Sequence, residues 1–395
     1  MTQLQRPLPI TLLSGFLGAG KTTILSEMLR QQDGRRIAVI VNDMSELNID
    51  ADITRTLLMD GDGTGLVELQ NGCICCTLRD DLVSEIAQFA RSGSFDYLII
   101  ESTGISEPLP VAAAFSHSLP DNATLLLSDV AQIDTLVTVV DGLKFLDDYR
   151  AGAPLENDDA ERTLSDLLIE QIEFANVLLI SKADLVTEDR MKQLTAILQA
   201  LNPSARIVPV VQGKISQNII LDTGLYDPKA MSLQPGWIAA LSGEKLPESE
   251  EYAIDSFIWS ARRPMHPERF WNLLSSCWDA GDVLRSKGFF WLATRPDSIG
   301  LYQQAGGTLK VEHAGTWWAA TPRDLWPAND EMRGWIHRKW SEPTGDRRQE
   351  IVFIGRKMNE TWLRCKLEAC LLTNEELDLN SSHWLSTPDP FPSWQ

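Results

Sequence analysis

Short apolar runs alternate with helix-like stretches through the first half of the chain. The runs are nearly continuous and rich in β-branched residues, and they lie at residues 10–13, 37–41, 97–100, 136–140, 177–180 and 207–211. Strands that are apolar on both sides belong to parallel sheets covered by helices on both faces. The pattern therefore predicts an α/β domain with a mainly parallel sheet, whose ligand binds at the carboxyl ends of the strands.

The pattern changes in the last two fifths of the chain, which hold all 13 tryptophans, from Trp237 to Trp394. Strands are expected at residues 253–260, 288–293 and 350–355, and helices at residues 267–280 and around Asn374. These elements make a smaller α+β domain. Prolines and an acidic run within residues 213–251 are typical of a connector. We therefore predict a first domain at residues 1–240 and a second at residues 241–395.

Charge and cysteine content narrow the classes of partner. The chain has 35 basic and 55 acidic residues, a net charge of −20, so we expect no nucleic-acid partner. No apolar run reaches the roughly 18 residues of a membrane helix, so we expect no membrane span. Without an export signal, the six cysteines are expected in the reducing cytoplasm, not in disulfides. Cys277, Cys365 and Cys370 are scattered among apolar residues and are expected in the core.

Residues 15–22 fit the phosphate-loop pattern G-x-x-x-x-G-K-[ST]. They follow an expected strand and open an expected helix at residues 23–30, which is the context that such a loop requires. Backbone N–H groups there wrap phosphates, Lys21 adds positive charge to the terminal phosphates, and Thr22 can ligate Mg²⁺. The flanking elements disfavour the alternative of a glycine-rich turn without a ligand. The sequence thus predicts a nucleoside triphosphate site.

A second strand end contributes to the same site. Glu101 directly follows the expected strand at residues 97–100, and Gly104 comes three positions later. A carboxylate at that place can hold the magnesium shell, while the Gly104 N–H can contact the γ-phosphate as a switch. The alternative is a solvated strand end without a ligand.

Residues 181–184, Ser-Lys-Ala-Asp, resemble the N-K-x-D guanine motif and follow another expected strand. Asp184 can accept hydrogen bonds from the guanine N1–H and 2-amino groups, which adenine does not offer together, and the stem of Lys182 can cover the ring. Ser181 replaces the usual asparagine, and an ordinary helix start remains the alternative. GTP is therefore favoured over ATP.

Three thiols, those of Cys73, Cys75 and Cys76, fall within four positions between the phosphate loop and the second strand end. They are too crowded for ordinary core packing and could supply three of the four tetrahedral ligands that Zn²⁺ prefers. The fourth ligand could come from Asp43, from Glu46 or from a client protein. Buried structural cysteines and a redox site remain the alternatives.

The four motifs, taken together, resemble those of the CobW-like family of metal-handling P-loop GTPases. They occur in the family's order at residues 15–23, 72–76, 101–104 and 181–184. Residues 262–264 and 345–350 look like the family's C-terminal domain, and the chain is most similar to its zinc-limitation branch. The resemblance implies that GTP binding and slow hydrolysis drive zinc transfer to a client apo-protein. A homodimer is a further candidate assembly.

The resemblance also implies a role for each matching residue. Phosphate and magnesium are expected at Gly15, Gly18, Ala19, Gly20, Lys21, Thr22 and Thr23. Catalysis is expected at Lys21, Glu101 and Gly104, guanine binding at Lys182 and Asp184, and zinc binding at Cys73, Cys75 and Cys76. The histidine-rich segment of many relatives is absent, which argues against bulk zinc storage.

Other functions remain open. Sulfur ligation favours Zn²⁺ over harder ions, but Co²⁺ also accepts it, so a cobalt or iron chaperone of the same family is the nearest rival. A passive zinc buffer is a second rival, and a nucleotide kinase or ATPase, which Asp184 disfavours, is a third. We expect the tryptophans and arginines of the second domain to recognise the client; the alternative is that the tryptophans only fill a small core.

Overall fold

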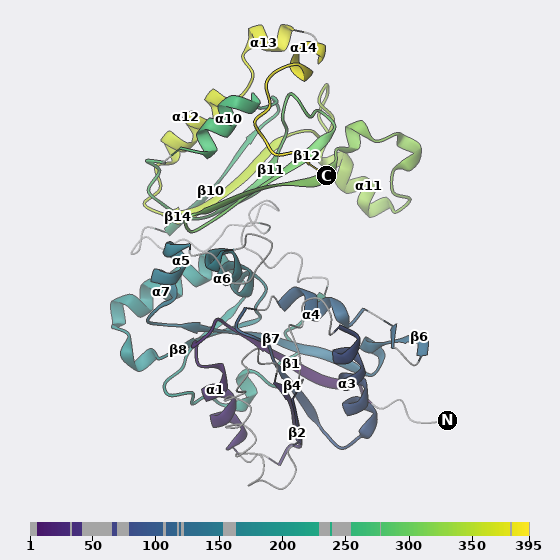
Figure 1. The fold of residues 1–395 in the computed structure, drawn as a ribbon, viewed down its shortest axis with the longest axis vertical. Helices are drawn as coiled ribbons and strands as arrows, with labels where there is room; N and C mark the ends of the chain where they lie inside the picture. The colour runs from purple at the N-terminus through teal and green to yellow at the C-terminus, as the bar shows by residue number, and fades with distance from the viewer. Residues whose placement is uncertain are drawn as a thin grey trace. The chain divides into compact units, whose positions relative to one another are not determined.

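The computed structural model describes residues 6–31, 34–41, 65–68, 79–105, 108–116, 118–119, 122–152, 163–228, 238, 254–276, 278–379 and 381–394. The chain divides into two compact units, Met1–Gly236 and Trp237–Gln395. Figure 1 shows that each unit has its own sheet and its own helices, so each is described by itself.

A seven-stranded parallel sheet forms the centre of the first unit, in the order β3-β2-β4-β1-β7-β8-β9. Its strands are β1 (Leu8–Ser14), β2 (Ile37–Val41), β3 (Gly65–Glu68), β4 (Tyr97–Glu101), β7 (Ala131–Asp141), β8 (Val177–Ser181) and β9 (Arg206–Pro209). Every residue of β2, β4 and β8 is buried, which explains their continuous apolar sequences. The predicted parallel sheet is confirmed. The apolar pattern does not predict β3 or the short antiparallel pair β5 (Ser118–Leu119) and β6 (Asn122–Leu126).

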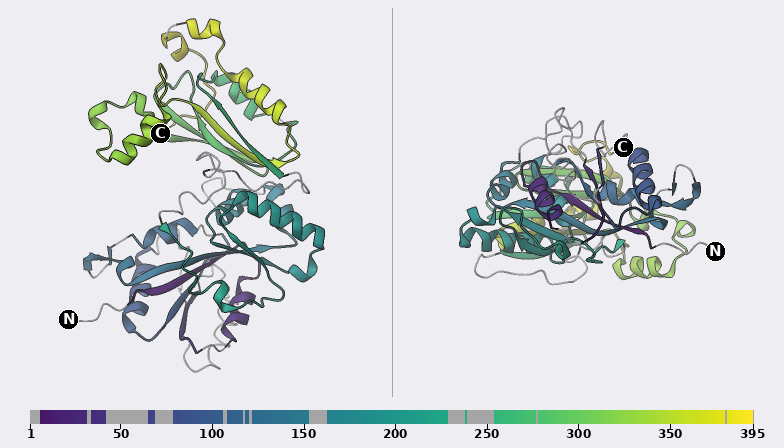
Figure 2. Two further views of the ribbon diagram at one scale, coloured as in Figure 1. Left: turned by 180° about the vertical axis from the view of Figure 1, so that it is seen from behind. Right: turned by 90° about the horizontal axis from the view of Figure 1, so that it is seen from below.

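Helices cover both faces of this sheet (Figures 1 and 2). They are α1 (Lys21–Leu29), α3 (Arg79–Ser92), α4 (Pro108–Ala114), α5 (Phe145–Ala151), α6 (Leu164–Glu173) and α7 (Glu188–Leu201). Ile24, Leu25 and Met28 of α1 pack against one face, whereas α3 and α4 pack against the other. A capping box fixes the start of α6, since Thr163 and Asp166 each accept a backbone N–H bond from the other.

A five-stranded antiparallel sheet, in the order β10-β14-β11-β12-β13, forms the second unit. Its strands are β10 (Ile254–Ala261), β11 (Asp282–Phe290), β12 (Ser298–Ala305), β13 (Thr308–Thr316) and β14 (Gln349–Arg356). Helices α10 (Pro267–Leu274) and α12 (Glu360–Cys370) lie over one face of the sheet (Figure 1). The core between them contains Trp259, Phe270, Phe353 and Leu363. The predicted smaller α+β fold is confirmed.

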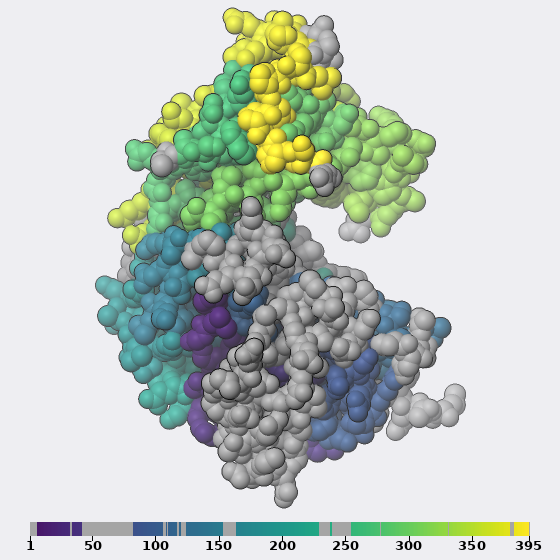
Figure 3. Space-filling view, viewed as in Figure 1, coloured from purple at the N-terminus to yellow at the C-terminus, as the bar shows by residue number. Residues whose placement is uncertain are grey.

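Two segments outside the sheet complete this second unit. Between β13 and β14, an insert of 3₁₀ turns and the helix α11 (Asp330–Lys339) projects beside the sheet (Figure 1). After α13 (Asn374–Asp378) and α14 (Ser381–Leu385), the last described residues run back over the unit, yellow in Figure 3. Phe391 is 5% exposed and joins the core, and Asp389 accepts a bond from Arg295 Nε at 2.8 Å. The final segment is therefore part of the folded unit.

Two further expectations concern cysteines and membranes. Cys370 is buried as expected, but Cys365 is exposed, because the two positions lie on different sides of α12. The expectation of a core position was wrong for Cys365; Cys277 lies outside the described residues. In the described part of the chain, none of the helices has the length and apolar content needed to span a bilayer.

Candidate nucleotide-binding site

The loop between β1 and α1 has a shape that its glycines make possible. Gly15 has a φ of 139°, and a Cβ there would lie 2.4 Å from the Val139 carbonyl oxygen, so only glycine fits. Gly18 and Gly20 also have positive φ, at 73° and 98°. Because Gly20 is the N-cap of α1, the first N–H groups of the helix face the loop without helical partners. The loop is therefore built to bind an anion.

Three side chains meet at this loop. Lys21 is 9% exposed, and its Nζ donates to the Gly15 carbonyl oxygen at 2.9 Å. Thr22 Oγ1 donates to Glu101 Oε1 at 3.3 Å. The parallel register places Leu13 of β1 opposite Glu101 of β4, so both strands end at the same edge of the sheet. The structure thus brings together Lys21, Thr22 and Glu101, as the sequence predicts.

Gly104 also lies against the loop. An added Cβ would lie 2.6 Å from Leu17 Cδ2 and 2.7 Å from the Leu17 backbone nitrogen. A larger residue would therefore displace the loop or the segment that follows β4. Thr23, by contrast, has an exposed side chain at the start of α1, while Ala19 is 1% exposed and packs in the core.

The predicted guanine motif lies beside the phosphate loop. Lys182 has a φ of 55°, and its Nζ donates to the Gly18 carbonyl oxygen at 3.0 Å and to Asp141 Oδ2 at 2.6 Å. Lys182 therefore connects the loop at residues 181–184, which carries the predicted guanine motif and is called the base loop below, to the phosphate loop and to the end of β7. Asp184 is exposed, and Ser181 Oγ donates to a backbone carbonyl of β7 at 3.2 Å.

Asp141 is the site residue that the sequence analysis missed. It is the last residue of β7, lies opposite Ser181 of β8, and accepts a bond from the backbone N–H of Leu143 at 2.9 Å. Its signal in the sequence is weak, since it is one acidic residue between an apolar run and Gly142. Such a strand end at the ligand-binding edge could have been singled out on position alone.

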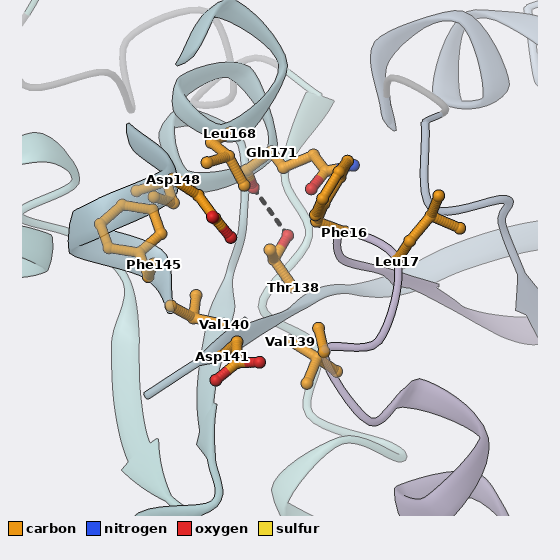
Figure 4. Close-up of a pocket in the computed structure, with 12 residues that line it drawn as sticks. Phe16, Leu17, Thr138, Val139, Val140, Asp141, Phe145, Asp148, Leu168 and Gln171 are labelled. Atoms are coloured by element: carbon orange, nitrogen blue, oxygen red, sulfur yellow. Dashed lines mark hydrogen bonds between the residues drawn. The ribbon is translucent and has the colours of Figure 1, made fainter. Parts of the chain in front are cut away.

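A pocket opens between the phosphate loop, the end of β7, α5 and α6 (Figure 4). Phe16 and Phe145 contribute aromatic walls, and the Asp148 carboxylate points into the space between them. Burial raises the pKa of the Asp148 carboxyl, against the opposing charge of Lys144 and with the added repulsion of Asp141. The pocket therefore adjoins both the phosphate loop and the end of β7 at Asp141.

The predicted metal ligands cannot be placed in this geometry. Cys73, Cys75, Cys76, Asp43 and Glu46 all lie outside the described residues, so the zinc site stays a prediction. Within the ranges that are described, no three or more His, Cys, Asp or Glu side chains are grouped so that they could hold a metal ion.

Comparison with known proteins shows the family. The nucleotide-binding domain of the CobW/HypB/UreG family matches residues 9–209, and the C-terminal domain of the cobalamin synthesis protein cobW matches residues 254–371. The zinc-regulated GTPase metalloprotein activator 1 of Dictyostelium discoideum is 44% identical over 97% of this chain and 84% of its own. The zinc chaperone CobW of a Sinorhizobium species is 28% identical over 81% of this chain and 91% of its own.

A solved structure, the Zn(II)-bound YjiA GTPase from E. coli, covers 93% of this chain and 100% of its own, with 22% identity and a TM-score of 0.41. That level of likeness supports no residue-by-residue comparison. The two domain matches and the 44% identity over nearly the whole chain agree with the parallel sheet and with the glycine loop between β1 and α1. The chain belongs to the CobW/HypB/UreG family of P-loop GTPases.

Proposed function

We propose that this GTPase is a zinc metallochaperone, which couples GTP binding and slow hydrolysis to zinc transfer to a client apo-protein in the zinc-limited cytoplasm. One observation carries the proposal. Buried Lys21 and Glu101 and half-buried Thr22 lie at the phosphate loop of a chain that is 44% identical, along almost its full length, to a protein named a zinc-regulated GTPase metalloprotein activator.

The nucleotide roles follow from the positions of the side chains. The main chain from Gly15 to Thr23 would cradle the phosphates, Lys21 would neutralise the terminal phosphate, and Asp184 would read guanine. The hydroxyl oxygen of Thr22 and a carboxylate oxygen of Glu101 lie 3.3 Å apart. Oxygen ligands suit a hard ion, so the residues present fit Mg²⁺, which would neutralise phosphate charge.

Slow turnover follows from the side chains that can act on the γ-phosphate. Phosphoryl transfer is catalysed mainly by positioning and charge stabilisation. Lys21 would supply positive charge, and the Gly104 N–H would contact the γ-phosphate. We assign no arginine of the chain as an arginine finger, which would stabilise the charge of the transition state. Since such fingers contribute roughly 10³ to 10⁵ in rate, we expect slow hydrolysis in the absence of a stimulating partner.

The zinc would be held by Cys73, Cys75 and Cys76, with Asp43, Glu46 or a client residue as the fourth ligand. Thiolate ligands favour Zn²⁺ over harder ions. The cysteines precede α3 in the sequence, and α3 leads into β4, which ends three residues before Gly104. One helix and one strand therefore connect the cargo site to the γ-phosphate sensor. A cobalt or iron chaperone is distinguished by the metal that changes GTP hydrolysis, because affinity at a given site favours Zn²⁺ over Co²⁺ and Fe²⁺ whatever the cargo.

The second unit is proposed to bind the client. Several of its motif arginines hold the unit together: Arg262 donates to the carbonyl oxygens of Gly345 and Lys339, and Arg348 to Glu350 Oε2. Trp259, Trp291 and Trp317 are buried, so these residues serve the fold. The α11 insert is different, because Leu325, Met332 and Trp335 are 67%, 49% and 40% exposed there. Exposed apolar clusters of this kind favour protein contacts, either with a client or in a homodimer.

The test measures GTP hydrolysis and zinc binding in three proteins: the wild type, Lys21→Ala, and the double variant Cys75→Ser with Cys76→Ser. The wild type should bind zinc and hydrolyse GTP slowly. Lys21→Ala should lose hydrolysis and keep zinc, while the cysteine variant should lose zinc and keep GTP binding. Unchanged turnover in Lys21→Ala would contradict the phosphate-loop assignment, and unchanged zinc affinity in the cysteine variant would contradict the cargo site. Hydrolysis assays with Zn²⁺, Co²⁺ or Fe²⁺ bound identify the metal that is coupled to turnover.

A further inference from the structure

Gln171 is a buried amide beside the nucleotide site. It lies on α6 and is 1% exposed. Its Nε2 donates to the Gly104 carbonyl oxygen at 3.4 Å, and Figure 4 shows its side chain next to Phe16 of the phosphate loop. Burying an amide costs free energy unless its hydrogen bonds are made. A leucine of similar size would fill the same space without that cost, so the polar group needs another explanation.

The backbone that carries Gln171 is fixed to the strand before the phosphate loop. Thr138 Oγ1 donates to the Gln171 carbonyl oxygen at 2.6 Å and shares a hydrogen bond of 2.9 Å with Ser14 Oγ. Ser14 is the last residue of β1 and directly precedes Gly15. All three side chains in this chain of contacts are buried. The amide of Gln171 therefore has a defined position relative to the phosphate loop.

Gly104 is held from two directions. On one side its main chain touches Leu17 of the phosphate loop so closely that no Cβ would fit. On the other side its carbonyl oxygen receives the Gln171 amide. Glycine has the greatest backbone freedom of any residue, and a bond to its carbonyl restricts ψ. The bond fixes the peptide plane between Gly104 and Ile105, and the close contact with Leu17 on the other side restrains the rest of the Gly104 main chain, including its N–H.

We propose that Gln171 is a positioning residue for GTP hydrolysis, which holds the main chain at Gly104 so that its N–H faces the γ-phosphate. The proposal rests on the switch role given to Gly104 above. Gln171 itself touches neither the nucleotide nor the reacting atoms. Its effect should therefore fall on steps that involve the γ-phosphate and leave GDP binding unchanged.

The first test compares Gln171→Leu with the wild type. The leucine keeps the volume and removes the donor. Affinity for a non-hydrolysable GTP analogue and the single-turnover rate should each fall about 3- to 10-fold, the effect of one hydrogen bond, with GDP affinity unchanged. Ser165→Ala is the matched control. Ser165 is also buried on α6, but it donates to the Tyr149 carbonyl oxygen at 2.5 Å, so its loss should lower the melting temperature and leave the ratio of analogue to GDP affinity unaltered.

The second test uses Gln171→Glu and pH. A carboxylate facing the Gly104 carbonyl repels it, whereas a protonated carboxyl can donate an O–H bond to it. Burial raises the pKa of such a glutamate. The hydrolysis rate of Gln171→Glu relative to the wild type should therefore rise as the pH falls from about 8 to about 6, while the same ratio for Gln171→Leu stays flat.

The outcomes separate this inference from the function on which it rests. A wild-type analogue-to-GDP ratio in Gln171→Leu, or a pH-independent ratio in Gln171→Glu, would overturn the positioning role while the wild type still hydrolyses GTP. If Gln171→Leu does not fold, the pH series of Gln171→Glu decides the question. A wild type without GTP hydrolysis would instead overturn the site assignment itself.

Discussion

Two carboxylates at the ends of buried strands organise the nucleotide site at the scale of single residues. Glu101 ends β4 and accepts a bond from Thr22 on the phosphate side. Asp141 ends β7 and binds Lys182 on the base side. Both carboxylates lie at the edge where parallel strands present ligand-binding groups. The phosphate loop and the base loop are thus held by separate acidic residues.

Replacing Asp141 with Asn should weaken binding of GDP and GTP alike. The charge-assisted bond to Lys182 would become a neutral one, and since the lysine side chain is 34% exposed, we expect only about a 5- to 10-fold loss. A fluorescent GDP titration measures it. Asp147→Asn is the control, because Asp147 is 70% exposed and pairs with Arg190 away from the loop. An unchanged affinity in a folded Asp141→Asn protein would refute the role.

Replacing Asp184 with Asn should change the base that is preferred. Asn offers a donor where Asp offers an acceptor, so xanthine nucleotides should gain relative to GTP. Competition against labelled GDP measures the order of affinities. Asp189→Asn, an exposed position at the start of α7, should leave that order unchanged. Equal affinity of the wild type for ATP and GTP would argue against the base assignment.

The sequence could predict the residues whose roles depend on their neighbours along the chain. The phosphate loop has one spacing and one context, so Gly15, Lys21 and Thr22 could be assigned from it. Position at a strand end could have marked Asp141 as a candidate, but the roles of Asp141 and Gln171 could not be assigned, because their partners lie 41 and 67 positions away. A lone acid after a strand and a glutamine within a helix are ordinary in sequence. Only the fold shows that they contact the two nucleotide loops.

At the scale of elements, strands buried on both sides could be predicted, whereas the more exposed strands β12 and β13 could not. All of β2 and β8 is apolar and buried. In β12, by contrast, buried and partly exposed positions are mixed and two glutamines follow the apolar residues, while in β13 no position is buried and Lys310 and Glu312 interrupt the run, so neither strand is expected from the apolar pattern. The start of α12 did carry a signal. Asn359 caps this helix by accepting from the Trp362 N–H at 3.1 Å.

His266 precedes helix α10, and its surroundings lower the pKa of its ring. His266 is the N-cap of α10, and its backbone N–H donates to the Cys370 carbonyl oxygen at 2.8 Å. Burial lowers the pKa of the ring, and the charge of Arg269 lowers it further, against opposing contributions from Glu376 and Glu268. The folded unit therefore prefers the neutral ring.

This preference predicts a loss of stability in mild acid. Below the unfolded pKa of about 6.5, the unfolded chain binds a proton that the folded chain resists, so the free energy of unfolding falls as the pH drops. Urea unfolding at about pH 7.5 and about pH 5.5 should show a smaller decrease for His266→Gln than for the wild type. Tryptophan fluorescence reports on this unit alone, because all 13 tryptophans lie within it. His383→Gln should behave as the wild type; a decrease in His266→Gln as large as in the wild type would contradict the account.

At the scale of the whole molecule, the chain consists of two units with separate cores. Two apolar layers enclose the parallel sheet of the first unit, and a third cluster belongs to the second. The phosphate loop, the segment that follows β4 and the loop at residues 181–184 all belong to the first unit. The domain boundary at residues 240 and 241 remains a prediction of this work, close to the division of the fold after Gly236.

Removing residues 254–395 should therefore leave nucleotide and zinc binding intact, since independent domains fold alone. The truncated chain should bind fluorescent GTP within about twofold of the full chain, and far-UV circular dichroism should show a cooperative unfolding transition. Loss of both ligands in a truncated chain that still unfolds cooperatively would show that the second unit contributes to the site.

Zinc binding and γ-phosphate binding are coupled in the function proposed for this chain. For such coupling the γ-phosphate must favour one arrangement of the thiolates over another. A typical coupling changes affinity about 5- to 150-fold, and linkage requires zinc to change GTP affinity by the same factor.

The most direct measurement is a titration of zinc against a chromophoric chelator, with either GDP or a non-hydrolysable GTP analogue bound. We predict zinc affinities that differ between the two states by about 5-fold or more, and a matching zinc effect on affinity for the analogue relative to GDP. The difference should vanish when Cys75 and Cys76 are replaced with Ser. Equal zinc affinity in the two nucleotide states of the wild type would contradict the account and leave two unconnected sites on one chain.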